Sequence, residues 1–173
     1  MEDANFYFKK VKNLDENLIK NLTTGKPSFV EHSWQYEMPK FDRTIMVYIN
    51  SFGEVQINFP DLYDKEFMKE IAKLIKKVYG VLKVGGYGVD EYDGEEELEI
   101  YQPKSMREIS PIWSANLFTP SEVQKYGREK LLKAPCEVIE EWEDGAIFMM
   151  IHRDKFSSTY EERKKLREYL EAK

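Results

Sequence analysis

Only a few residues of this chain have the types and spacing that catalytic or metal chemistry requires. There are two histidines, His32 and His152, and one cysteine, Cys136. A zinc site needs several histidine or cysteine ligands at short, regular spacings, and neither histidine has such a partner in the sequence. Cys136 lies on an expected strand beside Glu137, and an adjacent carboxylate raises the pKa of a thiol. These residues predict no metal centre and no cysteine nucleophile.

A glycine cluster at residues 85–88 invites comparison with a phosphate-binding loop. Such a loop opens a helix and carries a lysine, whereas this cluster leads into acidic residues from Asp90 onward. A calcium loop starting at Asp90 also fails, because Tyr92 and Gly94 stand where oxygen ligands are expected. We therefore expect no catalytic, cofactor-binding or metal-binding residues.

Acidic residues are concentrated in two blocks. The chain has 26 basic and 32 acidic residues, for a net charge of −6. A negative field repels nucleic acid and attracts basic proteins, although charge runs are also common on ordinary solvated surfaces. Our hypothesis is that the blocks bind a partner protein, and their charge favours a basic one. The residues are, in the first block, Asp90, Glu91, Asp93, Glu95, Glu96, Glu97 and Glu99 and, in the second block, Glu141, Glu143 and Asp144.

The stretch from Pro111 to Ile151 carries the clearest structural signals. An apolar run at 112–118, which includes Trp113, predicts a buried strand. Thr119, Pro120 and Glu122 then form a capping box with proline at the first helical position. Gly127 is expected to end this helix, and Pro135 prevents a second short helix from continuing. We expect these residues, like Gly145 in the turn described next, to have structural roles.

After Pro135 the pattern changes to the alternation of a half-buried strand. Asp144 and Gly145 are a preferred pair for a two-residue turn in which both central residues have positive φ. The apolar run at 146–151 then predicts a return strand inside the sheet.

The other elements follow from periodicity and breaking residues. A helix should begin at a cap on Asp61, bury Phe67, Ile71, Leu74, Ile75 and Val78, and end at Gly80. A second capping box, Thr159 with Glu162, should start a C-terminal helix with Arg163, Lys164, Lys165 and Arg167 in solvent. We also expect an edge strand at 6–11, a helix at 13–21, a strand at 29–38, a hairpin at 44–59 turning at Gly53, and strands at 81–84 and 98–101.

These elements predict an α+β fold in a single domain spanning residues 1–173. Short connections favour a mainly antiparallel sheet with helices packed on one face. A hairpin followed by a helix occurs twice, at 44–79 and at 136–171, although the two units share element order and not sequence.

One part of the chain resembles a known family. The residues that carry the resemblance are Trp113 to Glu122, Tyr126 to Leu132, Ala134-Pro135 and Glu143-Asp144-Gly145. They are similar to the C-terminal half of the Immunity protein 52 family and of related immunity proteins of bacterial toxin systems. The resemblance covers residues 111–151. It implies an antitoxin that binds a cognate toxin in the cytosol and performs no chemistry.

We therefore expect a cytoplasmic immunity protein that neutralises its toxin stoichiometrically. A small-molecule enzyme of unrecognised type, or a general protein-interaction module, is the alternative. A single cysteine excludes an intrachain disulfide, and the first residues lack the features of a signal peptide. No run approaches the ~20 apolar residues of a membrane span.

Overall fold

The structure is a computed structural model that describes residues 3–23, 32–90, 93 and 112–173. Its helices and strands, in chain order, are β1 (Asp3–Phe8), α1 (Glu16–Leu22), β2 (Ser33–Met38), a 3-10 turn (Pro39–Phe41), β3 (Arg43–Ile49), β4 (Val55–Pro60), α2 (Lys65–Leu82), β5 (Gly86–Asp90), β6 (Ala115–Phe118), α4 (Pro120–Tyr126), α5 (Arg128–Leu132), β7 (Val138–Glu141), β8 (Ile147–Met150) and α6 (Tyr160–Glu171).

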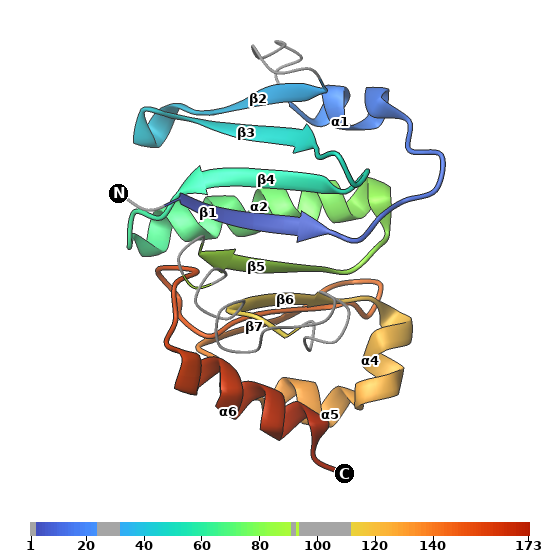
Figure 1. The fold of residues 1–173 in the computed structure, drawn as a ribbon, viewed down its shortest axis with the longest axis vertical. Helices are drawn as coiled ribbons and strands as arrows, with labels where there is room; N and C mark the ends of the chain where they lie inside the picture. The colour runs from blue at the N-terminus through green and yellow to red at the C-terminus, as the bar shows by residue number, and fades with distance from the viewer. Residues whose placement is uncertain (1–2, 24–31, 91–92, 94–111) are drawn as a thin grey trace.

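One eight-stranded sheet joins the two halves of the chain. The strand order is β2-β3-β4-β1-β5-β6-β8-β7, and every neighbouring pair is antiparallel. The two predicted hairpins are present as β3–β4 and β7–β8, each followed by a helix (Figure 1). The α+β class and the antiparallel sheet are confirmed. In the described part of the chain, no helix is both long and apolar enough to cross a membrane.

The main core lies between the sheet and α2, which runs behind the strands in Figure 1. All five predicted stripe residues of α2 are buried, from Phe67 to Val78. Alternate residues of the central strands meet them, including Phe6 of β1 and Phe59 of β4. Phe156, from the loop before α6, packs edge-on against Phe59 with ring centroids 5.1 Å apart. The period of two in the strands therefore assigns one face of the sheet to this core.

The C-terminal helices cover the opposite face at the other end of the sheet. Leu117 and Phe148 belong to the α2 core, whereas their chain neighbours Phe118 and Ile147 belong to a second cluster with residues of α4, α5 and α6. The expected single helical face therefore describes α1 and α2 only. Helices can cover both faces of the sheet at this end, because every residue of β6 and β8 is buried and both faces of these strands contact a core.

Three predictions about strand and helix limits were wrong. The first strand is not at an edge, since β1 pairs with β4 on one side and β5 on the other. Helix α2 is capped by Asp64, whose side chain accepts from the amides of Glu66 and Phe67, and it continues past Gly80 to Leu82. The predicted strand at 81–84 is replaced by β5, which contains the glycine cluster. Leu82 is buried, and its packing explains why the helix continues.

Local signals for caps and turns were more accurate. Both capping boxes are present, at Thr119 with Glu122 and at Thr159 with Glu162, and Gly53 and Gly127 have positive φ. The β7–β8 turn has three residues instead of two, because the amide of Gly145 donates to Trp142 O and the amide of Trp142 donates to Ala146 O. Only Gly145 of this turn has positive φ.

Candidate functional site

The first acidic block is partly internal. Asp90 is fully buried and Asp93 is 6% exposed. Arg163 of α6, also fully buried, lies with its Nη1 3.3 Å from Asp93 Oδ2. The prediction that Arg163 and Arg167 face solvent was wrong, and neither Asp90 nor Asp93 presents a carboxylate to a partner. The remaining predicted residues of this block, Glu91, Glu95, Glu96, Glu97 and Glu99, lie outside the described residues.

The second acidic block is paired with basic residues of the same chain. Arg128 donates to both carboxylate oxygens of Glu141, at 2.7 and 2.6 Å. Lys76 of α2 forms an ion pair with Glu143 at 3.0 Å, and Lys83, the residue after α2, forms one with Asp144 at 3.2 Å. Burial alone would raise the pKa of Asp144, but hydrogen bonds from the Tyr79 hydroxyl, the Ala146 amide and Lys83 outweigh it, so the pKa lies below its usual value. This hairpin is therefore no bare patch of negative charge.

The predicted structural residues lie where they can stabilise the fold. Trp113 is 5% exposed, stacks on Tyr87 at 6.0 Å between centroids, and has the Arg167 guanidinium 5.4 Å from its ring. Its backbone is held by Asn116, whose Oδ1 accepts from Trp113 N and whose Nδ2 donates to Trp113 O. Pro135 follows the end of α5. Sequence reasoning missed Asn116, although its only signal, a polar residue within an apolar run, was visible.

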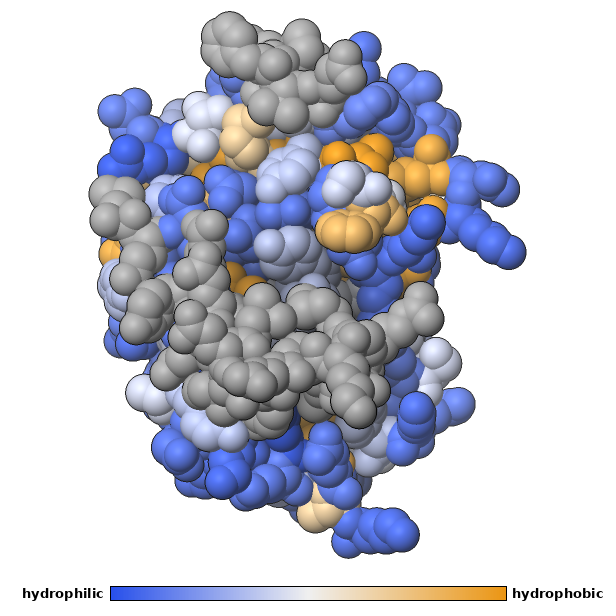
Figure 2. Space-filling view, viewed as in Figure 1, coloured by the Kyte–Doolittle hydropathy of each residue, from blue (hydrophilic) through white to orange (hydrophobic). Residues whose placement is uncertain are grey.

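A polar and aromatic face of the sheet was also missed. We call this surface the open face, because no described helix covers it in Figure 1. The same direction in Figure 2 presents hydrophilic and intermediate side chains over β3, β4 and β1. Cross-strand register places its residues in two rows, Tyr48, Gln56, Tyr7 and Tyr87 in one and Gln35, Met46, Asn58 and Asn5 in the other. None of the eight side chains carries a charge at neutral pH.

Three amides at the centre of the open face are fixed by one another. Asn5 Oδ1 accepts from Gln56 Nε2 at 2.8 Å and from Asn58 Nδ2 at 2.9 Å. Beside them Tyr7 stacks on Tyr87, with ring centroids 5.3 Å apart. Burial raises the pKa of Tyr87, and Glu54 raises it further, so the hydroxyl stays protonated. Asn5 and Gln56 are each only 7% exposed, so the amide network fixes the face from within, while Asn58, Tyr7 and Tyr87 remain partly exposed.

An exposed phenylalanine borders this face. Phe52, in the β3–β4 turn, is 75% exposed. The turn is ordered by Asn50, whose Oδ1 accepts from the amides of Phe52 and Glu54 at 3.0 and 3.1 Å. Gly53 supplies the positive φ that the turn requires. The well-ordered turn therefore keeps the Phe52 ring exposed to solvent, and this turn follows the cross-strand pair of Tyr48 and Gln56.

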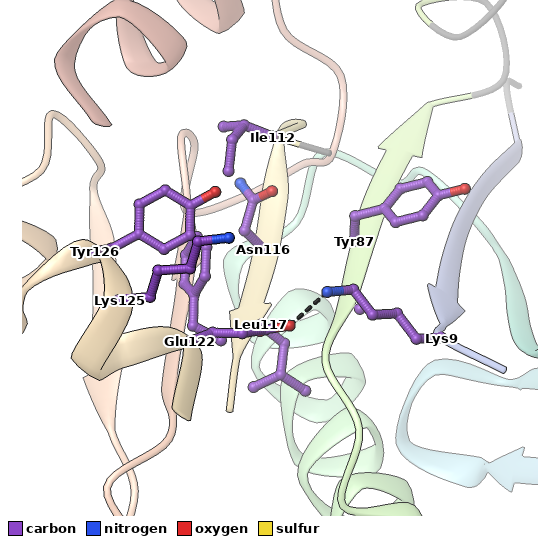
Figure 3. Close-up of a pocket in the computed structure, with 10 residues that line it drawn as sticks. Lys9, Tyr87, Ile112, Asn116, Leu117, Glu122, Lys125 and Tyr126 are labelled. Carbon is purple, nitrogen blue, oxygen red and sulfur yellow. Dashed lines mark hydrogen bonds and ion pairs between the residues drawn. The ribbon is translucent and has the colours of Figure 1, made fainter. Parts of the chain in front are cut away.

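A pocket of about 140 Å³ lies where the open face meets α4. Tyr87 and Asn116 line its floor, and Lys125 and Tyr126 of α4 line one wall (Figure 3). Lys9, of the chain segment after β1, lies on the opposite side and forms an ion pair with Glu122 of α4.

The cysteine and the histidine that the structure describes in the C-terminal half, Cys136 and His152, do not form a common site with other chemically reactive groups among the described residues. Burial raises the pKa of Cys136 to about 12, which makes it a poor nucleophile. His152 lies between Glu137 and Glu162, with its Nε2 3.1 Å from Glu162. Within residues 3–23, 32–90, 93 and 112–173, no three histidine, cysteine or carboxylate side chains are grouped as metal ligands.

Comparison with known proteins gives no match, since no family model, no curated protein and no solved structure is significantly similar to this chain. The resemblance to immunity proteins over residues 111–151 stays a prediction.

Proposed function

We propose that this chain is an immunity protein that binds and neutralises a cognate toxin, and that it grips the toxin with the open face and Phe52. The observation that carries the proposal is the uncharged, tyrosine-rich face beside an exposed phenylalanine. The centres of protein interfaces are depleted of charge and enriched in aromatic residues. Tyrosine contributes a large contact area at a small cost in conformational entropy.

The edges of the face fit the same interpretation. Asp3 and Glu37 are exposed next to the row that contains Asn5 and Gln35, towards one end of the strands, and Lys10 lies beside Gly53 at the other end of the strands. A neutral centre with a charged border is the usual anatomy of a protein interface. Asn5 and Gln56 are each 7% exposed and hydrogen-bonded to one another, so they hold the face in a fixed shape, and the partly exposed tyrosines supply its contact area.

That the partner is a toxin rests on the resemblance of residues 111–151 to immunity proteins. A general protein-interaction module would use the face in the same way but would protect no cell. The cytosol is the compartment in which such a protein would act.

Growth protection tests the proposal. We expect co-expression of this chain to restore growth to cells that produce the toxin domain encoded beside its gene. Phe52→Ser should weaken toxin binding by roughly 30-fold or more, as expected for an interface hot spot. Val81→Ser is the matched control, because Val81 is also an exposed apolar residue but lies on α2, behind the sheet.

Ionic strength separates the open face from the acidic blocks. A contact through the neutral face predicts an association rate that changes little with salt, whereas an acidic interface predicts a steep decrease as screening increases. Equal protection by Phe52→Ser and the wild-type chain, together with a steep salt dependence, would refute the open face as the toxin-binding surface.

A further inference from the structure

The pocket beside the open face is lined by two lysines, Lys9 and Lys125, and by one carboxylate, Glu122. We propose that it binds a carboxylate and that, in the complex with the partner protein, this carboxylate is the side chain of a partner aspartate or glutamate. The inference rests on the proposed function, because it treats the pocket as an anchor point of the same interface.

Three hydrogen-bond donors converge in the pocket. Figure 3 shows the Lys125 ammonium, the Tyr126 hydroxyl and the Asn116 amide on the same side of the cavity. Burial raises the pKa of Tyr126, and Glu122 and Glu171 raise it further, so the hydroxyl keeps its proton. Asn116 Nδ2 uses one hydrogen for Trp113 O and has a second hydrogen. A carboxylate accepts bonds at two oxygens, which suits a set of donors.

The charge balance also favours an anion. Glu122, the carboxylate that lines the pocket, is already used: Oε2 accepts from the Thr119 amide at 3.0 Å, and Oε1 pairs with Lys9. Lys125 makes no ion pair or hydrogen bond with any residue in the described part of the chain. The pocket therefore keeps the charge of Lys125 while the charges of Lys9 and Glu122 offset each other.

Size and position indicate a side chain of a larger partner. A space of about 140 Å³ is below the range of cavities that enclose drug-sized ligands, yet it admits a short carboxylate side chain. Tyr87 belongs both to the open face and to the pocket lining, so a partner that covers the face reaches the pocket directly. The Phe118 and Ile112 side chains supply apolar walls for the methylene groups of the entering residue.

The test uses capped amino acids as probes. We expect N-acetyl-glutamate methylamide, at millimolar concentration, to shift the NMR signals of Lys125, Tyr126 and the Asn116 side-chain amide. N-acetyl-glutamine methylamide should shift them far less. The glutamate shifts should disappear in Lys125→Gln and persist in Lys20→Gln, which removes an exposed lysine from the last turn of another short helix.

A second measurement addresses the source of the carboxylate. Loss of one charge-assisted contact should weaken binding of the toxin domain by roughly tenfold or more in Lys125→Gln. Equal shifts from both probes, or shifts outside the pocket, would overturn the proposal. Glutamate-specific shifts combined with unchanged toxin affinity would assign the pocket to a free carboxylate and would overturn the partner side chain. If Phe52→Ser retains full toxin binding while Lys125→Gln loses it, the proposal that the open face binds the toxin is refuted, and the proposal that the pocket binds a partner carboxylate is supported.

Discussion

Arg163 offers the sharpest test of how this fold is held together. It lies in the first turns of α6, is fully buried, and joins that helix to Asp93 just beyond β5. Its Nη1 also donates to the carbonyl and hydroxyl oxygens of Ser158, and the Ser158 amide donates to Asp93 Oδ2 at 2.8 Å. Asp90, fully buried, accepts from the Asp93 amide. Removing the cation would leave the buried Asp93 carboxylate without the guanidinium that lies 3.3 Å from it.

The geometry sets the expected magnitude. At the 3.3 Å separation of Arg163 and Asp93 the Coulomb attraction is ~5 kcal/mol for an effective dielectric constant of about 20. Desolvation of both ions offsets most of this attraction, so the net contribution of the intact pair is small. Removing only Arg163 has a larger effect on stability, because it leaves the buried Asp93 carboxylate without the compensating positive charge of Arg163. We expect Arg163→Met to lower the free energy of unfolding by about 3–5 kcal/mol.

A double-mutant cycle with Asp93→Asn isolates the pair. Asparagine keeps an acceptor for the Ser158 amide and removes the charge, so the double variant should be more stable than Arg163→Met alone. Urea unfolding at neutral pH measures the stability of all three variants. Lys164→Met is the control, because Lys164 is the next residue along the helix and its side chain is 46% exposed. A loss below about 1 kcal/mol in Arg163→Met, or additive losses in the double variant, would refute the reasoning.

Three further predictions concern single positions. Trp113→Ala should cost about 3–5 kcal/mol of stability in thermal unfolding, since the ring is 5% exposed; an unchanged melting temperature would contradict this. Gly88→Ala should cost about 1–3 kcal/mol, because its Cβ would lie 2.2 Å from Phe156 Cε2. Gly80→Ala, which meets nothing within 4 Å in α2, is its control and should gain up to about 1 kcal/mol. Burial raises the pKa of Asp61 above 3.8, against hydrogen bonds from the Ser157, Phe156 and Tyr63 amides. The folded state therefore holds this proton more tightly than the unfolded state, and the ionised group destabilises the fold above its folded pKa. Asp61→Asn should be more stable than the wild-type chain at neutral pH, and urea unfolding should show this advantage disappear as the pH falls below the unfolded pKa.

Several features caused by residues within four positions were predicted correctly from the sequence, although the cap of α2 lies at Asp64 and not at Asp61. The capping box of Thr119 and Glu122 depends on two residues three positions apart, and Gly53 needs only its own freedom at positive φ. The buried stripe of α2 repeats with the helical period, which neighbouring residues define. These predictions were confirmed, because the bonds and contacts that define them join residues of the same turn or the same helix.

Features caused by distant residues were not readable. Asn5 is 51 residues from Gln56, and only the β1–β4 register brings their amides together. The central position of β1 in the sheet likewise depends on its pairing with β5, which lies far from it in the sequence. Arg163 has the pattern of a solvated helix position, and the buried carboxylates that attract it are on another element. The open face could not be predicted from the sequence for the same reason, since its residues come from five strands that only the fold brings together.

The acidic blocks illustrate how charge in sequence differs from charge in space. A run of acids looks like a patch when only its neighbours along the chain are considered. Glu143 is 67 residues from Lys76, and Glu141 is 13 residues from Arg128, yet each pair is in contact in the fold. Conversely, Lys125 is an ordinary lysine in a helix until the fold places it over a pocket whose only lining carboxylate among the described residues is already paired with Lys9. Binding surfaces are therefore to be sought where folding leaves side chains accessible, and among the described residues of this protein we infer these to be the partly exposed tyrosines of the open face, the Phe52 ring and the Lys125 ammonium.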